Sequence, residues 1–134
     1  MSRVRIVSAA AIALLAVPAL VGCGAESSPE VAAMCSTFEE AGGTAATIGL
    51  VQIWVPKEDL LPAVSDKLDA LGDSTPPAEV ADEWNAVKGH YERIRDEAEA
   101  LPAGGTLMGS DLLQESTTMT DDMEAVAKYI SDHC

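Results

Sequence analysis

The amino-acid sequence predicts an all-α protein, a small bundle of four to five helices. Apolar residues recur in steps of three and four over most of the chain after residue 28, and residues that start or stop helices bracket these stretches. A single segment, residues 44–55, has the β-branched composition of a strand, and a strand without a neighbour cannot satisfy its backbone hydrogen bonds. The length of 134 residues fits one domain.

The first helix is expected to run from Pro29 to Gly42-Gly43. Ser28 is a favourable N-cap, and proline suits the first helical position because the N–H it lacks has no partner there. The apolar residues of this stretch have helical spacing: Val31, Met34, Cys35 and Phe38. Residues 44–55 admit a strand or a helix, and we expect a buried turn or short helix that belongs to the core.

Two longer helices are expected in the middle of the chain. One is capped by Asp59, tolerates Pro62 in its first turn and stops at Gly72, with an apolar stripe of Leu60, Leu61, Val64, Leu68 and Leu71. The other is capped by Thr75, opens with Pro76-Pro77 and ends before Pro102. Its apolar residues follow the roughly 3.5-residue period of a bundle helix: Val80, Trp84, Val87, Tyr91, Ile94, Ala98 and Leu101.

Two further helices are expected towards the end of the chain. Residues 107–115 are predicted to hold a short helix that begins at Ser110 or Asp111. The last helix is predicted to be capped by Thr118 or Thr120, and acidic residues in its first turn favour the positive end of the helix dipole. Its apolar stripe is Met119, Met123, Val126, Ile130 and Cys134.

The first 22 residues differ from the rest and have the order of a secretory signal peptide. Arg3 and Arg5 precede an uncharged apolar stretch, residues 6–20, and small residues follow it. The run ends in Leu20-Val21-Gly22-Cys23, which resembles the lipobox of bacterial lipoproteins at all four positions. A transmembrane helix is the first alternative, but the run is shorter than the roughly 20 apolar residues of a membrane span and contains Pro18. An ordinary signal peptide, cut at a site such as Cys23-Gly24-Ala25, is the second.

The lipobox resemblance implies that Cys23 carries a lipid and that the chain is cut between Gly22 and Cys23. Two or more acyl chains then anchor the protein at the extracytoplasmic face of a cell membrane, where one chain alone holds it only marginally. The expected organisation is a signal peptide over residues 1–22, a flexible tether over 23–28 and a helical domain over 29–134. The chain also looks like the small helical lipoproteins of actinobacteria, many without assigned function, and this likeness carries no binding or catalytic residue with it.

Lipidation of Cys23 leaves two of the three cysteines, Cys35 and Cys134, available to each other. They lie on the apolar sides of the first and last predicted helices, and the predicted compartment is oxidising. We therefore expect one disulfide that closes the helical domain. Free buried thiols are the alternative.

The charge balance excludes some partners. The sequence has 8 basic and 22 acidic residues, and cleavage of the signal peptide removes Arg3 and Arg5. A domain this acidic repels nucleic acid and anionic lipid head groups, so we expect no nucleic-acid role and no membrane contact beyond the lipid anchor.

The search for catalytic chemistry gives few candidates. Neither His90 nor His133 has a convincing partner, and the neighbours of His90 three and four residues away include no metal ligand. The acidic runs lack the spacing of a metal site, so no metal or cofactor is expected. The leading hypothesis is a non-enzymatic interaction domain. If the apolar segment is exposed, a groove for an envelope protein or a small apolar ligand would be lined by Trp54, Met108 and Met119. The alternative is an envelope hydrolase or metal-dependent enzyme that uses His90 and nearby acids.

Overall fold

The computed structural model describes residues 28–43 and 47–134, so the predicted signal peptide, the lipobox and nearly all of the tether lie outside the described residues. The described chain forms α1 (Pro29–Glu40), α3 (Lys57–Gly72), a 3-10 turn η1 (Ala78–Val80), α4 (Ala81–Ala100), α5 (Leu112–Thr118) and α6 (Thr120–His133). No strand occurs within these described ranges. The all-α prediction is confirmed.

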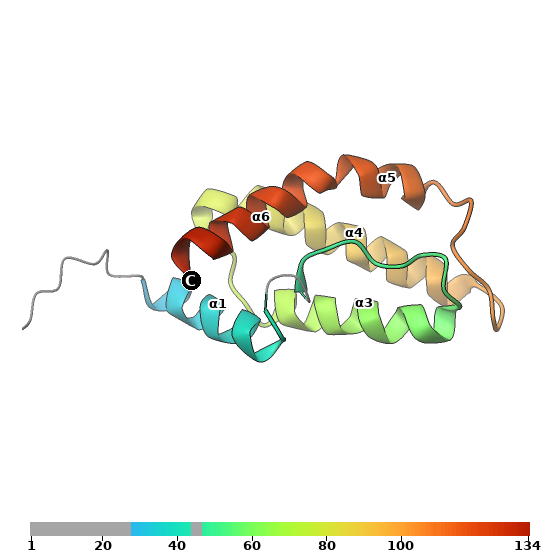
Figure 1. Cartoon of the computed structure of the whole chain (residues 1–134), viewed down its shortest axis with the longest axis horizontal. Coiled ribbons are helices and arrows are strands. Elements are labelled where there is room, and N and C mark those ends of the chain that lie inside the picture. Colours follow the sequence, from blue (N-terminus) through green and yellow to red (C-terminus); the bar gives the residue numbers. More distant parts are fainter. Residues whose placement is uncertain (1–27, 44–46) are drawn as a thin grey trace, which may run out of the picture.

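Helix α4 lies at the centre of the bundle. It packs against α3 and against α6, and α1 packs against α6 near the C-terminus. Figure 1 shows α3 and α4 running in opposite directions, with α5 and α6 following each other back along α4. The end of the bundle that carries the start of α1 and the C-terminus is therefore opposite the end that carries the loop between α4 and α5.

The core follows the predicted apolar stripes. On α4 the stripe residues are buried almost completely: Trp84, Val87, Tyr91, Ile94 and Ala98. Helix α1 contributes Phe38, whose ring meets Trp84 edge to face with 5.4 Å between ring centroids, and α6 contributes Met123, Val126 and Ile130. Helices α3 and α6 thus bury their stripes against the two sides of α4, which holds the bundle together through apolar burial.

The predicted ends of α1 are confirmed. The Ser28 hydroxyl accepts a hydrogen bond from the Val31 N–H at 3.3 Å, as an N-cap should, and Pro29 is the first helical residue. After the last helical residue, Gly42 and Gly43 adopt φ values of 94° and 92°, a conformation that favours glycine. The Gly43 N–H donates to the Phe38 carbonyl at 2.7 Å and so closes the end of the helix.

The predicted starts of α3 and α4 were wrong. Helix α3 begins at Lys57, with Pro56 rather than Asp59 at the N-cap, so Pro62 lies in the second turn instead of the first. The chain after Thr75 does not enter a helix directly, because Pro77 leads into the short η1 and α4 starts only at Ala81. Proline fixes an extended approach to α3 and to η1, and both α3 and α4 begin without a side-chain cap.

The predicted threonine cap of α6 was also wrong. Met119 occupies the junction between α5 and α6, and its N–H donates to the Glu115 carbonyl at 2.9 Å. The hydroxyls of Thr118 and Thr120 donate back to the carbonyls of Glu115 and Ser116. Because the helical bonding of α5 nearly continues into α6, these hydroxyls are drawn to carbonyls of the preceding turn instead of capping N–H groups. The predicted start of α5 after Asp111 is correct.

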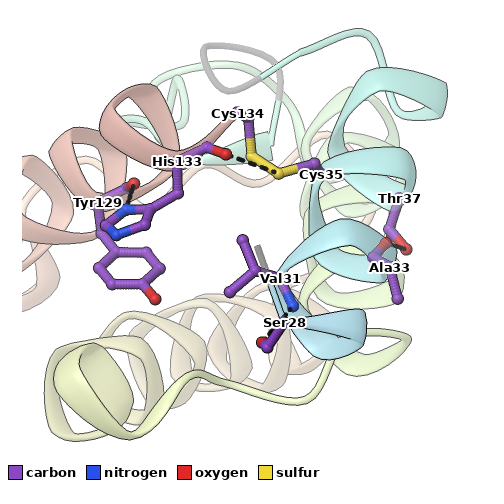
Figure 2. The surroundings of a disulfide bond; sticks show 8 residues. All are labelled: Ser28, Val31, Ala33, Cys35, Thr37, Tyr129, His133 and Cys134. Carbon is purple, nitrogen blue, oxygen red and sulfur yellow. Dashed lines mark hydrogen bonds between the residues drawn. A yellow bond between two sulfur atoms is a disulfide. The ribbon is translucent and has the colours of Figure 1, made fainter. Parts of the chain in front are cut away.

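The predicted disulfide is confirmed, although not in the position expected. Cys35 and Cys134 are joined, with 5.5 Å between their Cα atoms, and Figure 2 shows the bond linking α1 to the end of α6. Cys35 is partly buried and packs against the core, as expected, but Cys134 is exposed, so the bridge lies at the edge of the core and reaches the surface. The stripe of α6 ends at Ile130, because the chain leaves the helix after His133.

Removal of this bridge should destabilise the domain strongly. The two cysteines are 99 residues apart. A loop of this length restricts the unfolded chain by about 4 to 5 kcal/mol in the chain-entropy estimate. We therefore expect the doubly substituted Cys35→Ser, Cys134→Ser variant to lose about 4 kcal/mol of unfolding free energy, measured by urea titration. A reductant that opens the disulfide should lower the unfolding free energy of the unsubstituted protein by a similar amount. It should leave that of the double variant unchanged. A loss below about 1 kcal/mol would contradict the prediction.

Candidate functional site

Residues 48–56 cross α4 as a series of bends and turns without helix or strand. The Tyr91 hydroxyl on α4 fixes this segment, because it donates to the Gly49 carbonyl at 2.7 Å and accepts from the Gly49 N–H at 2.8 Å. Burial raises the pKa of Tyr91 to about 12, so the phenol stays protonated and keeps its donor. Of the alternatives for the predicted region 44–55, a turn describes residues 48–55, whereas residues 44–46 lie outside the described residues.

The expectation that this apolar segment belongs to the core is correct for only part of it. Ile48 and Ile53 are buried, whereas Leu50 and Trp54 are 65% and 58% exposed. The backbone turns at residues 53–55. The turn directs the side chain of Ile53 into the core and that of the adjacent Trp54 towards solvent. Leu50 and Trp54 are therefore candidates for contact with a partner.

The loop between α4 and α5 lies against this segment. The Leu107 N–H donates to the Ile53 carbonyl at 3.0 Å, and the Lys57 N–H donates to the Gly105 carbonyl at 2.9 Å. Met108 follows Leu107 as Trp54 follows Ile53, and Met108 is 71% exposed. The structure thus brings two of the predicted contact residues, Trp54 and Met108, onto neighbouring loops. We call these loops, residues 48–56 and 101–111, the distal loop pair.

A carboxylate strengthens the link between these loops. Glu58, in the first turn of α3, accepts from the Gly104 N–H with its two carboxylate oxygens at 3.1 and 3.2 Å. Hydrogen bonds from its own backbone N–H and from Gly104 hold the pKa of Glu58 below its usual value, so the carboxylate remains charged at neutral pH.

Met119, the third predicted contact residue, lies elsewhere. It stands at the junction of α5 and α6, is partly buried and packs against the core. It therefore does not share the high exposure of Trp54 and Met108. Contact of Met119 with a partner stays a prediction, and its position differs from the exposed positions of Trp54 and Met108.

Leu50 separates two shallow hollows that the sequence did not suggest. On its α3 side a hollow of about 280 Å³ is lined by Leu50, Val51, Gln52, Val55, Asp59, Leu60, Ala63 and Lys67. On its α6 side a hollow of about 230 Å³ is lined by Ile48, Gly49, Leu50, Thr120, Met123, Glu124 and Ala127. Both linings combine apolar side chains with a carboxylate, and the α3 side also includes Lys67, an arrangement that suits contact with another molecule.

His90 has partners that the sequence analysis missed. Its ring is 1% exposed on α4, with Nδ1 3.1 Å from Glu115 Oε1 and Nε2 3.2 Å from Ser116 Oγ. Burial, and then the positive charge of Arg93, lower the pKa of His90 and favour the neutral ring. In that state Nδ1–H donates to the carboxylate and Nε2 accepts from the hydroxyl, an assignment that satisfies both ring nitrogens.

The expectation that His90 has no convincing partner was therefore wrong. Glu115, which also pairs with Arg93, and Ser116 lie 25 and 26 residues further along the chain, on α5. A survey of positions three and four residues away on the same helix cannot find them. His133, the other histidine, stacks on Tyr129 with 4.0 Å between ring centroids and bonds to the carbonyl of that residue, as Figure 2 shows.

Other features of the described residues give little chemistry. A hollow of about 340 Å³ between α1 and α3 is polar, and four of its lining residues are acidic: Glu40, Asp66, Asp69 and Asp73. Within the described ranges, no group of three or more histidine, cysteine, aspartate or glutamate side chains is arranged to hold a metal ion. None of the helices described here combines the length and the apolar character needed to cross a bilayer.

Comparison of the chain with protein-family models, with curated proteins and with solved structures found no match. The function must therefore be argued from the residues themselves. Two features stand out: the exposed apolar side chains of residues 48–56 and of the loop before α5, and the buried His90 with its two partners on α5.

The lowered pKa of His90 predicts how stability changes with pH. Above the ordinary histidine pKa of 6.5 the ring is neutral in both states. Below it the unfolded chain binds the proton more readily than the folded one, so stability falls as the pH is lowered. Between about pH 7.5 and 5.5 we expect a loss of up to about 1.4 kcal/mol, the limit for a histidine that stays neutral when folded.

Urea titrations at the two pH values test this expectation, with the two histidines as matched controls. His133→Gln replaces the other histidine and leaves His90 and its partners in place, so we expect it to keep the pH dependence. His90→Gln should lose most of it, whatever its own effect on stability. An equal pH dependence in His90→Gln and the unsubstituted protein would show that another group is responsible.

Proposed function

We propose that the chain is a membrane-anchored extracytoplasmic lipoprotein whose helical domain is a non-enzymatic interaction module, with the lipid on Cys23. The observation that carries the proposal is the exposure of Trp54 and Met108 on loops that backbone hydrogen bonds hold in place. Large apolar side chains on a fixed surface are more useful to a partner than to the isolated protein, because water solvates them poorly. The partner is an envelope protein or a small apolar ligand.

The arrangement of the bundle supports contact away from the bilayer. The start of α1, nearest to the proposed anchor, and the loop before α5 lie at opposite ends of the structure (Figure 1). Five residues from Cys23 to Ser28 span at most roughly 18 Å, and a 20-residue helix such as α4 adds about 30 Å of rigid length. The distal loop pair would then face outward, and the strongly acidic composition would keep the domain away from anionic head groups.

Two measurements on the full chain, produced in a bacterium that processes lipoproteins, test the proposal. Intact mass should show a chain beginning at Cys23 with acyl mass, and Cys23→Ala should move the protein from the membrane to the soluble fraction. A photo-crosslinking residue in place of Trp54 should give a discrete adduct in intact envelopes, whereas the same residue in place of the exposed Ala33 on α1 should not. Unmodified Cys23, or equal crosslinking from both positions, would contradict the proposal.

A second candidate function, hydrolysis of an envelope ester, is favoured by the hydrogen-bonded series Ser116, His90 and Glu115. In such a series the serine Oγ attacks the ester carbonyl while its proton passes to His Nε2. The leaving alcohol takes that proton, and water then cleaves the acyl-serine in the same way. The carboxylate holds the ring in the tautomer that this chemistry needs.

The surroundings of Ser116 favour a structural role for this series. Ser116 is partly buried, and it lines none of the three hollows described above. The N–H groups of the preceding turn, from Leu113 to Glu115, already donate to the carbonyls of Ser110 and Asp111. An oxyanion would therefore find no free backbone donor in that turn. We rank the series as a polar link that holds α5 to α4.

Labelling with a fluorophosphonate, which reacts with activated serines, separates the two functions. The interaction module should show no labelling of Ser116 above the level in Ser116→Ala, and no ester turnover that His90→Gln abolishes. A stoichiometric adduct on Ser116 that disappears in His90→Gln would make hydrolysis the leading function. Circular dichroism of each variant checks that the helices remain folded.

A further inference from the structure

We infer that the two hollows beside Leu50 receive two apolar side chains of one partner segment, and that lysine or arginine residues flank those side chains. This inference rests on the proposed function and makes its partner specific: a basic, amphipathic segment of a protein. The segment would cross the exposed Leu50 side chain and place one apolar residue on the α3 side and one on the α6 side.

The size of the hollows favours side chains over a whole small-molecule ligand. Their volumes of about 280 and 230 Å³ are each below the range of roughly 300 to 1,000 Å³ that is usual for small-molecule sites. The Leu50 side chain, 65% exposed, stands between them. Two small depressions on either side of a ridge match successive apolar residues of a helix or extended segment.

The charges at the hollows favour a basic segment. Asp59 lines the α3 side, Glu124 lines the α6 side, and both are exposed. Lys67 also lines the α3 side, but it is buried, and its ammonium group lies 5.8 Å from the centre of the Tyr91 ring. The two exposed carboxylates therefore set the charge that a partner meets, and opposite charges beside the apolar contacts would orient it.

The support beneath the hollows is already fixed. Tyr91 holds Gly49 by two hydrogen bonds, and the neighbouring Ile48 is buried beside it. Ile53 is also buried, and its carbonyl accepts from Leu107. Since the Leu50 segment is held on both sides, little ordering would be needed on binding. A lipid surface is disfavoured because anionic head groups would meet Asp59 and Glu124.

A designed peptide tests the inference directly. The probe is an amphipathic helical peptide of leucine and lysine, titrated by calorimetry into the full chain and into two variants. Leu50→Asp removes the ridge between the hollows, and Leu113→Asp makes the same change at another exposed leucine. We expect Leu50→Asp to weaken binding about tenfold and Leu113→Asp to leave it within about twofold. General attraction to an acidic protein would strengthen binding in both variants alike.

Three outcomes would overturn the inference. The first is equal affinity of the peptide for the two variants. The second is equally tight binding of a peptide that has glutamate in place of lysine. The third is binding of phosphatidylglycerol vesicles or oleate that depends on Leu50 and is tighter than binding of the peptide. Failure here remains distinct from failure of the proposed function. Without peptide binding, a Trp54 crosslink in envelopes still supports an interaction module. With Leu50-dependent peptide binding and unmodified Cys23, only the anchor is lost.

Discussion

The apolar face of α4 is buried along its length, and the other helices pack around it. Helices α3 and α6 contact α4, and α1 and α5 contact α6. Trp84 receives Phe38 from α1, and the apolar stripes of α3 and α6 close over the residues that follow. Two buried side chains of α4, Tyr91 and His90, have polar groups that bond to other segments. Tyr91 binds the backbone at Gly49, and His90 binds α5. Apolar burial supplies the cohesion, while these two side chains determine where the irregular segments lie.

This division explains what the sequence predicted well. The stripe from Val80 to Ala98 identified the face of α4 that is buried, because helical periodicity depends only on residues close together in the chain. Ser28 and Gly42-Gly43 marked the ends of α1 for the same reason. The starts of α3 and α4 were misplaced because α3 follows Pro56 and α4 follows the short η1, both without a side-chain cap, and polar residues nearby resembled better caps.

The candidate site was only partly predictable. Trp54 and Met108 attracted attention as large apolar residues outside the stripes, but their neighbouring positions depend on the bond from Leu107 to Ile53, which joins residues 54 positions apart. The partners of His90 are separated from it in the same way. The hollows beside Leu50 arise where three segments meet, so no local pattern foretold them. The disulfide was predictable from the small number of cysteines, and its exposure was not.

Residues 48–56 combine a fixed backbone with exposed apolar side chains. Residues 48–56 gain their fixed shape from buried isoleucines and from Tyr91, which leaves the exposed side chains of the same segment free to contact another molecule. His90 and its partners, by contrast, are satisfied by one another and offer little access. The exposed apolar side chains of residues 48–56 are therefore accessible to another molecule, whereas the ring of His90 is buried.

The bridge between Cys35 and Cys134 has a consequence for a domain exposed to proteases. It converts residues 35–134 into a covalent ring. One proteolytic nick in any loop of that ring opens it without releasing a fragment, since both pieces stay joined through the sulfur atoms. A nicked molecule would remain attached to residues before Cys35, and with them to any anchor there. Loss of the domain from its site would require a second cut or a reductant.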